Sequence, residues 1–391
     1  MATSRLQSVD FLRGLVIIFM TVDHVREFFY FAVPLPDPME VEKVDVPTFV
    51  SRLLAHFCAP TFVFLTGLSA WLLADRRSLT HRELAWFLLK RGALFMVLEV
   101  TLINFAWTFS FPPEKVFLQV IWAIGFSMIC LAGLVWLPWY VQLAMAITLV
   151  AGHNLLDSVK FAPGTPANWL WALLHDRQTL KLGSVSIRTS YPVLPWIGII
   201  GLGYASGRWF QKGQRGNLLL WAGLGACAAF VGLRIWGGYG EPSKWQMHED
   251  RNLLSFLEFF NLTKYPPSLL FTLMTLGPAL VVLWGANEWR VRFPGEGGRI
   301  YRAIVGLGRV PFLFYVVHLY FLHWSYRVCG LFFGYSWNGK PLHSEMPSRL
   351  DVGSIWFVWL IAVLTLVVLY PVVSVFARLK REGRFAVLRY F

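Results

Sequence analysis

Long apolar runs recur along the whole chain and are separated by short polar segments. A helix needs about 20 apolar residues to cross the hydrocarbon core of a bilayer, and about ten of the runs approach that length. The expected spans are 12–32, 47–74, 86–110, 116–136, 139–156, 192–210, 217–236, 263–286, 308–330 and 354–377. The pattern predicts an all-α polytopic membrane protein in which residues 1–391 form a single transmembrane domain. Pro60 lies in the second span and predicts a tilted or broken helix there.

Composition supports this class. Hydrophobic residues make up 56% of the chain and charged residues 15%, against roughly 25% charged residues in soluble domains. These values exclude a soluble enzyme, a disordered protein and a disulfide scaffold. The four cysteines lie in apolar runs without metal-binding spacing, so we expect reduced packing residues and no metal site. The first apolar run is too long for a signal peptide and lacks a cleavage site, so we expect it to remain as the first span.

The distribution of charge predicts an orientation. The net charge is +13, and an N-terminus in the cytoplasm places about 20 of the 35 basic residues on the inner side. Cytoplasmic loops of membrane proteins carry this excess of Lys and Arg, so the charge requires no nucleic-acid partner. We therefore expect both termini in the cytoplasm and outer loops at 33–46, 157–191, 237–262 and 331–353.

Ionisable residues interrupt the first span near its outer half. Asp23, His24, Arg26 and Glu27 lie within five residues, and His24 is about 18 Å along the helix at 1.5 Å per residue. Ionisable groups in a bilayer are costly and indicate a function by default. Asp23 can reach Arg26, and Glu27 can orient His24, because each pair is three residues apart. The alternative is a structural network that joins helices.

Other polar residues form two further groups. Asp10 and Arg13 lie at the inner mouth of the first span, where Arg13 either pairs with Asp10 or meets a phosphate or carboxylate. Tyr191, Lys264 and Tyr265 lie at the outer ends of the sixth and eighth spans. They indicate either a shaped acceptor site or interfacial aromatic anchors.

Several segments together resemble a known family. Ser8–Gly14 followed by Asp23 and His24 is similar to the first span of the heparan-alpha-glucosaminide N-acetyltransferase catalytic-domain family. The similarity continues in segments 56–60, 118–122, 191–196, 264–267 and 308–311. The pattern Asp-x-x-Arg-Gly with a following His also resembles, more distantly, the acyltransferase-three family of membrane acyltransferases.

The resemblance implies an enzyme that moves an acyl group, here acetyl, from cytoplasmic acetyl-CoA to a saccharide or glycolipid at the outer side of the membrane. His24 matches the proposed catalytic residue, acting as a base or as an acyl carrier, with Asp23 and Glu27 beside it. The residues expected at the acyl-CoA site are Arg13, Asp10, Arg309, His318 and His56, and those expected at the acceptor are Tyr191, Lys264 and Tyr265. Resemblance to bacterial members places the protein in the inner membrane, and homodimerisation is left open.

Two alternatives come from other function classes. A proton-coupled transporter would use Asp23, His24 and Glu99 as a relay, although no inverted repeat is visible in the sequence. A non-catalytic membrane scaffold would leave the charges of the first span unexplained. Binding of CoA thioesters separates the enzyme from both alternatives.

Overall fold

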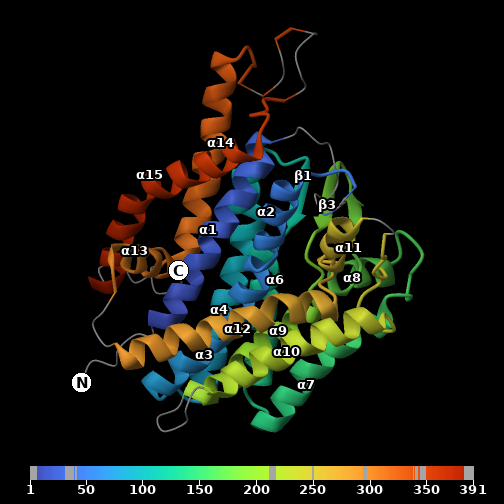
Figure 1. The fold of residues 1–391 in the computed structure, drawn as a ribbon, viewed down its shortest axis with the longest axis vertical. Coiled ribbons are helices and arrows are strands. Elements are labelled where there is room, and N and C mark those ends of the chain that lie inside the picture. The colour runs from blue at the N-terminus through green and yellow to red at the C-terminus, as the bar shows by residue number, and fades with distance from the viewer. Residues whose placement is uncertain are drawn as a thin grey trace. The chain divides into compact units, whose positions relative to one another are not determined.

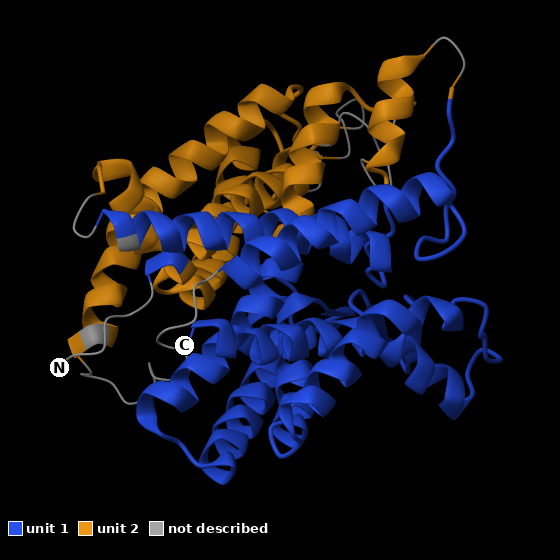
Figure 2. Ribbon diagram, turned by 60° about the horizontal axis from the view of Figure 1, so that its bottom comes forward, with its two compact units in different colours: residues 1–8, 59–247, 262–294 blue, residues 9–58, 248–261, 295–391 orange. Residues whose placement is uncertain are grey.

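The computed structural model describes residues 7–30, 39, 42–210, 217–248, 251–293, 297–337, 339, 342–343 and 349–382. Most of the expected outer loop 33–46, part of the loop 331–353 and the end of the basic tail lie outside the described residues. Figure 1 shows the helices and strands. The chain groups into two compact units, which Figure 2 shows in different colours. Unit 1 contains residues 1–8, 59–247 and 262–294, and unit 2 contains residues 9–58, 248–261 and 295–391. The two units describe only which residues contact one another. The expectation that the chain forms a single transmembrane domain therefore stays a prediction.

Unit 1 consists of helices and one small sheet. Its helices are α3 (Cys58–Arg77, from Ala59), α4 (His81–Leu98), α5 (Asn104–Thr108), α6 (Val120–Leu134), α7 (Trp139–Gly152), α8 (Pro166–Leu174), α9 (Leu194–Ala205), α10 (Asn217–Trp236) and α12 (Leu269–Arg292). A π-helical turn, η1 (Glu99–Ile103), joins α4 to α5, and 3₁₀ turns follow α7 (η2, His153–Leu156) and α9 (η3, Ser206–Phe210).

The small sheet of unit 1 was not predicted. Strands β1 (Lys115–Leu118), β2 (Thr179–Leu182) and β3 (Val185–Thr189) have the order β1-β3-β2. β1 and β3 are parallel, and β2 and β3 form an antiparallel hairpin. Gly183 takes a positive φ of 61° between the two hairpin strands, a conformation that glycine adopts without a steric penalty. The architecture is therefore helical with a three-stranded addition.

Unit 2 is entirely helical among its described residues. It contains α1 (Gln7–Phe29, from Val9), α2 (Val46–His56), α11 (Asn252–Phe259), α13 (Arg299–Gly308), α14 (Pro311–Phe332) and α15 (Ile355–Glu382). The break that Pro60 predicts occurs at Phe57, between α2 and α3. Pro60 has no N–H to donate to the carbonyl of His56 one turn earlier, so the helix is interrupted at that point.

Glycines allow close contact between helix backbones in both units. A Cβ atom on Gly67 of α3 would lie 2.0 Å from the carbonyl oxygen of Ile200 in α9, and one on Gly203 would lie 2.0 Å from that of Phe64. In unit 2, a Cβ atom on Gly14 of α1 would lie 1.9 Å from the carbonyl oxygen of Ile304 in α13. Small residues at crossings are typical of membrane helices, where van der Waals contact drives association.

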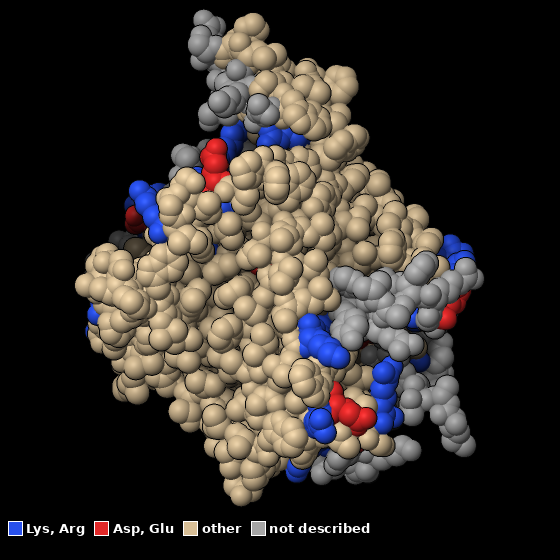
Figure 3. All heavy atoms as spheres, turned by 180° about the vertical axis from the view of Figure 1, so that it is seen from behind, with Lys and Arg blue, Asp and Glu red and all other residues tan. Residues whose placement is uncertain are grey.

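Membrane character is evident from helix length and composition. Five helical segments in the described part of the chain are long and apolar enough to cross a bilayer. They are Val46–Arg77 (α2 and α3 taken together), Trp139–Leu156, Asn217–Trp236, Leu269–Arg290 and Ile355–Lys380. A sixth candidate is the pair α13–α14, which bends by 89°. The described atoms on the face in Figure 3 are largely free of Lys, Arg, Asp and Glu. The ten spans and the sides of the termini stay predictions.

We predict that Gly67→Ala destabilises the protein by about 1–3 kcal/mol, because the added methyl group overlaps the α9 backbone. The measurement is thermal unfolding in detergent. Gly285→Ala is the matched control, because a Cβ atom there meets nothing within 4 Å and alanine favours a helix by up to about 1 kcal/mol. Equal unfolding midpoints for the two variants would contradict the close α3–α9 contact.

Candidate functional site

A pair of histidines joins α1 to α14 in unit 2. The Nδ1 atom of His24 lies 2.7 Å from the Nε2 atom of His318. Their rings are nearly parallel, with centroids 5.0 Å apart and an interplanar angle of 7°. The His318 side chain is completely buried. The structure thus brings together two histidines that the sequence assigned to separate roles.

The hydrogen bonds define which ring nitrogen carries each proton in a neutral pair. The Nδ1 atom of His318 lies 2.8 Å from the backbone carbonyl of Phe314, which can only accept, so Nδ1 carries the proton. Nε2 of a neutral His318 is then an acceptor and takes its hydrogen bond from Nδ1–H of His24. His24 consequently has its basic lone pair on Nε2. This is the arrangement that a general base requires.

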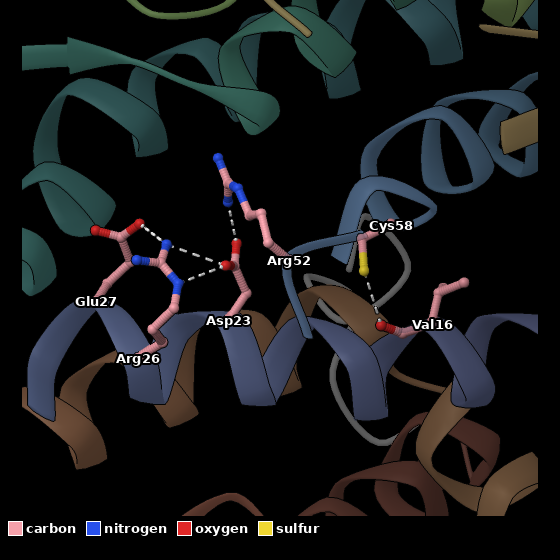
Figure 4. Close-up of polar contacts among 6 residues, drawn as sticks. All are labelled: Val16, Asp23, Arg26, Glu27, Arg52 and Cys58. Atoms are coloured by element: carbon pink, nitrogen blue, oxygen red, sulfur yellow. Dashed lines mark hydrogen bonds and ion pairs between the residues drawn. The ribbon is translucent and has the colours of Figure 1, made fainter. Parts of the chain in front are cut away.

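Asp23 lies between two guanidinium groups (Figure 4). Arg26 donates to Asp23 from Nε at 3.2 Å and from one terminal nitrogen at 3.1 Å, as the spacing predicts. Arg52 of α2 donates to the other carboxylate oxygen at 2.7 Å. Both Arg52 and Asp23 are largely buried. The pairing holds Asp23 as a carboxylate that joins α1 to α2. The sequence analysis missed Arg52, although a charged residue inside the second expected span was a visible indication.

The structure pairs Glu27 with Arg26, and His24 with His318, in place of the expected contact between Glu27 and His24. Glu27 forms its ion pair with Arg26 at 2.5 Å (Figure 4), whereas the ring nitrogen Nδ1 of His24 bonds to His318. Adjacent guanidinium and carboxylate groups attract each other more strongly than a neutral imidazole attracts a carboxylate. The partner that orients His24 is therefore His318.

A hydrogen bond joins the first residue of α3 to α1. The thiol of Cys58 donates to the carbonyl oxygen of Val16 at 3.2 Å (Figure 4). His56, the last residue of α2, is completely buried.

The residues expected at the inner end of the first span, Asp10 and Arg13, lie in unit 2. Arg13 bonds to Asp10 at 3.4 Å, which is the local pair that the sequence allows. A Cβ atom on Gly308 would lie 1.8 Å from the backbone oxygen of Asp10, so the end of α13 lies directly against the first turns of α1. Arg309 is the next residue after Gly308.

The three residues expected at the acceptor lie together in unit 1. The rings of Tyr191 and Tyr265 are edge to face at 5.0 Å, and the Lys264 ammonium lies 5.3 Å from the Tyr265 ring. The guanidinium of Arg177, which the sequence analysis did not select, lies 4.4 Å from the same ring. Cations on aromatic faces are stabilised by the ring quadrupole. The cluster combines stacking surfaces with positive charge.

Glu99 has a structural contact that accounts for its position. It is completely buried and accepts a hydrogen bond from the backbone N–H of Trp122 at 2.8 Å. Trp122 lies in the first turn of α6, where backbone N–H groups lack partners within the helix. Glu99 therefore caps the first turn of α6.

Comparison with known proteins identifies a family. The family described as "Heparan-alpha-glucosaminide N-acetyltransferase, catalytic" matches residues 5–235. The match includes α1 with His24 as well as Tyr191, and it ends before Lys264, Tyr265 and His318. No protein with a curated description matches the chain.

We predict that Asp23 and Arg52 are energetically coupled. A double-mutant cycle with Asp23→Asn and Arg52→Met should give a coupling energy of about 0.5–3 kcal/mol in the free energy of unfolding, because the two groups are in contact. Asp23→Asn combined with Arg82→Met, an exposed arginine of α4, should be additive. Additivity in the Asp23–Arg52 cycle as well would contradict the ion pair.

Proposed function

Because the chain belongs to the heparan-alpha-glucosaminide N-acetyltransferase catalytic family, we propose that this membrane acetyltransferase uses cytoplasmic acetyl-CoA and acetylates a saccharide or glycolipid. The observation that carries the proposal is the hydrogen-bonded pair of His24 and His318. A neutral imidazole with a fixed proton on one nitrogen and a basic second nitrogen suits proton abstraction from a hydroxyl or amine.

In the proposed reaction, Nε2 of His24 removes the proton from the acceptor hydroxyl or amine as the acceptor atom attacks the thioester carbonyl. The carbon–sulfur bond then breaks, and the sulfur of CoA leaves with the proton that His24 holds. His318 acts as a positioning residue: it accepts the bond from Nδ1–H and stabilises the positive charge that develops on His24, as the third group of a catalytic triad does. An acetyl-His24 intermediate is the alternative route.

The donor would be held by the region around Arg13 and Arg309. Acyl-CoA carries several phosphate charges, which arginine binds in a bidentate manner. Asp10 keeps Arg13 in place at 3.4 Å, and the contact between Gly308 and Asp10 supports a common location for the two arginines. His56 is proposed to line the path of the acyl arm.

The proposed topology has ten spans with both termini in the cytoplasm of a bacterial inner membrane. The excess of basic residues on the assigned inner side supports it. Tyr191, Lys264, Tyr265 and Arg177 then belong to the outer side, where sugar rings stack on aromatic faces and bond to cations. We propose this cluster of unit 1 as an acceptor-binding surface.

Acetyl transfer tests the function. Membrane vesicles that contain the protein and carry an envelope glycolipid extract in both leaflets of their bilayer are given acetyl-labelled acetyl-CoA, and the CoA thiol and labelled lipid are followed. We expect transfer in inside-out vesicles, and in right-side-out vesicles only after permeabilisation, because acetyl-CoA does not cross the membrane. His24→Gln should lose at least about 100-fold in rate, the usual contribution of acid–base catalysis.

His318→Leu should lower kcat while leaving KM for acetyl-CoA unchanged, and His318→Gln should retain more activity because its amide oxygen can accept the bond from His24. His81→Gln, an exposed histidine of α4, is the control. Wild-type activity of folded His24→Gln would contradict the role of His24. Absence of both thiol release and acetyl-CoA binding in the wild type would contradict the function.

We further predict that Arg13→Ala raises the Kd for acetyl-CoA by about tenfold, equivalent to about 1.4 kcal/mol, since a charge-assisted contact is removed. Isothermal titration in detergent measures the Kd, and thermal unfolding shows whether the variant remains folded. Arg82→Ala removes the same charge from an exposed position and should leave the Kd unchanged. Equal Kd values for Arg13→Ala and the wild type would exclude Arg13 from the donor site.

A further inference from the structure

Three side chains with metal-binding atoms converge in unit 1, and none of them has a role in the proposed reaction. His153 and Asp157 flank the turn that ends α7, and His175 follows α8. One ligand atom from each lies within 4.8 Å of those of the other two. The cluster requires a separate explanation, because nothing in the acetyl-transfer proposal involves it.

The spacing of the atoms matches a tetrahedral metal. Nδ1 of His153 lies 3.2 Å from Nε2 of His175, which lies 3.5 Å from Oδ1 of Asp157. Zinc binds histidine nitrogen and carboxylate oxygen at about 2.0–2.2 Å, so ligands at the corners of a tetrahedron lie about 3.3–3.6 Å apart. These two distances agree with this edge length, and the third pair of ligand atoms lies within 4.8 Å.

Neighbouring side chains hold the three ligand groups in position. The side-chain N–H of Asn154 donates to Oδ2 of Asp157 at 2.9 Å, which leaves Oδ1 directed at the histidines. The ring of Trp171 stacks on His175 with centroids 5.1 Å apart. Hydrogen bonds such as that from Asn154 orient ligands in known metal sites.

The environment combines burial with an opening. His153 and His175 are 2% and 3% exposed, whereas the Asp157 side chain is 32% exposed. An ion can therefore enter beside Asp157, and a water molecule can complete the coordination. Nε2 of His175 also lies 2.9 Å from the carbonyl of His153, so a bound metal replaces this hydrogen bond and the neutral imidazole carries its proton on Nδ1 instead.

We propose that His153, Asp157 and His175 bind one Zn²⁺ ion, with water as the fourth ligand. The ion connects the end of α7 to the segment after α8. Two residues beyond His175, Arg177 lies over the Tyr265 ring, and the backbone N–H of Leu269, four residues after Tyr265, donates to Oδ1 of Asn154 at 2.9 Å. The metal therefore stabilises the two loops that form the aromatic and cationic cluster of unit 1, whether or not that cluster binds an acceptor.

The test uses the full-length protein in detergent, without a histidine tag and after removal of metals by a chelator. Co²⁺ is the probe, because tetrahedral Co²⁺ gives an intense visible absorption, and Zn²⁺ is then used to displace it. We expect one Co²⁺ per chain in the wild type. His175→Gln should abolish this spectrum, and Asp157→Asn should weaken binding at least tenfold. His81→Gln serves as the control and should behave as the wild type.

Thermal unfolding provides the second readout. Zn²⁺ should raise the unfolding midpoint of the wild type, because a ligand that binds only the folded state stabilises it, and should not raise that of Asp157→Asn. Asp157→Asn keeps the shape of a partly exposed side chain. It therefore tests the site even if His175→Gln has a folding defect. Absence of stoichiometric binding in the wild type, or unchanged binding in both variants, would overturn the proposal and leave a hydrogen-bonded structural cluster.

Discussion

The hydrogen bond between His24 and His318 connects residues 294 positions apart and determines how α1 and α14 are arranged in unit 2. In an apolar interior, an imidazole without a partner costs the full desolvation energy of its polar atoms. The carbonyl of Phe314 fixes His318, and His318 fixes His24. A single chain of donors and acceptors thus sets both the contact between the helices and the protonation pattern of the proposed base.

The other polar residues of α1 follow the same constraint. Asp23 meets Arg52 of α2, and Arg13 meets Asp10 within α1. In addition, Gly14 and Gly308 allow the backbones of α1 and α13 to approach closely. The helix with the most charges is therefore held by polar partners and by close backbone packing. We regard this arrangement as a preorganised site rather than a set of separate ion pairs, since each partner restricts the next.

Several features could be predicted because they depend on local rules. Apolar run length predicted helices and membrane character, the i, i+3 spacing predicted the Asp23–Arg26 and Asp10–Arg13 pairs, and Pro60 predicted the break at Phe57. Tyr191, Lys264 and Tyr265 were grouped by their shared position at the outer ends of spans, and the structure brings them together.

Other features depend on tertiary contacts that spacing does not encode. The pairing of His24 with His318 required the fold, and so did the role of Arg52. The short β1-β3-β2 sheet escaped notice because its strands are brief and their pairing is nonlocal. His153 and Asp157 are four residues apart near the end of a span, a helical ligand spacing that the sequence shows, but their third partner is His175, beyond the next helix.

The most direct test of the central claim is the protonation state of His24 itself. Nitrogen NMR of the detergent-solubilised protein, labelled with ¹⁵N in its histidines, distinguishes neutral imidazoles protonated on Nδ1 from those protonated on Nε2. Comparison with His24→Gln assigns the signal of His24. We expect His24 at neutral pH to be uncharged, with its proton on Nδ1 and an Nδ1–H signal that shifts in His318→Leu. A proton on Nε2 of His24, or a signal insensitive to His318, would contradict the account.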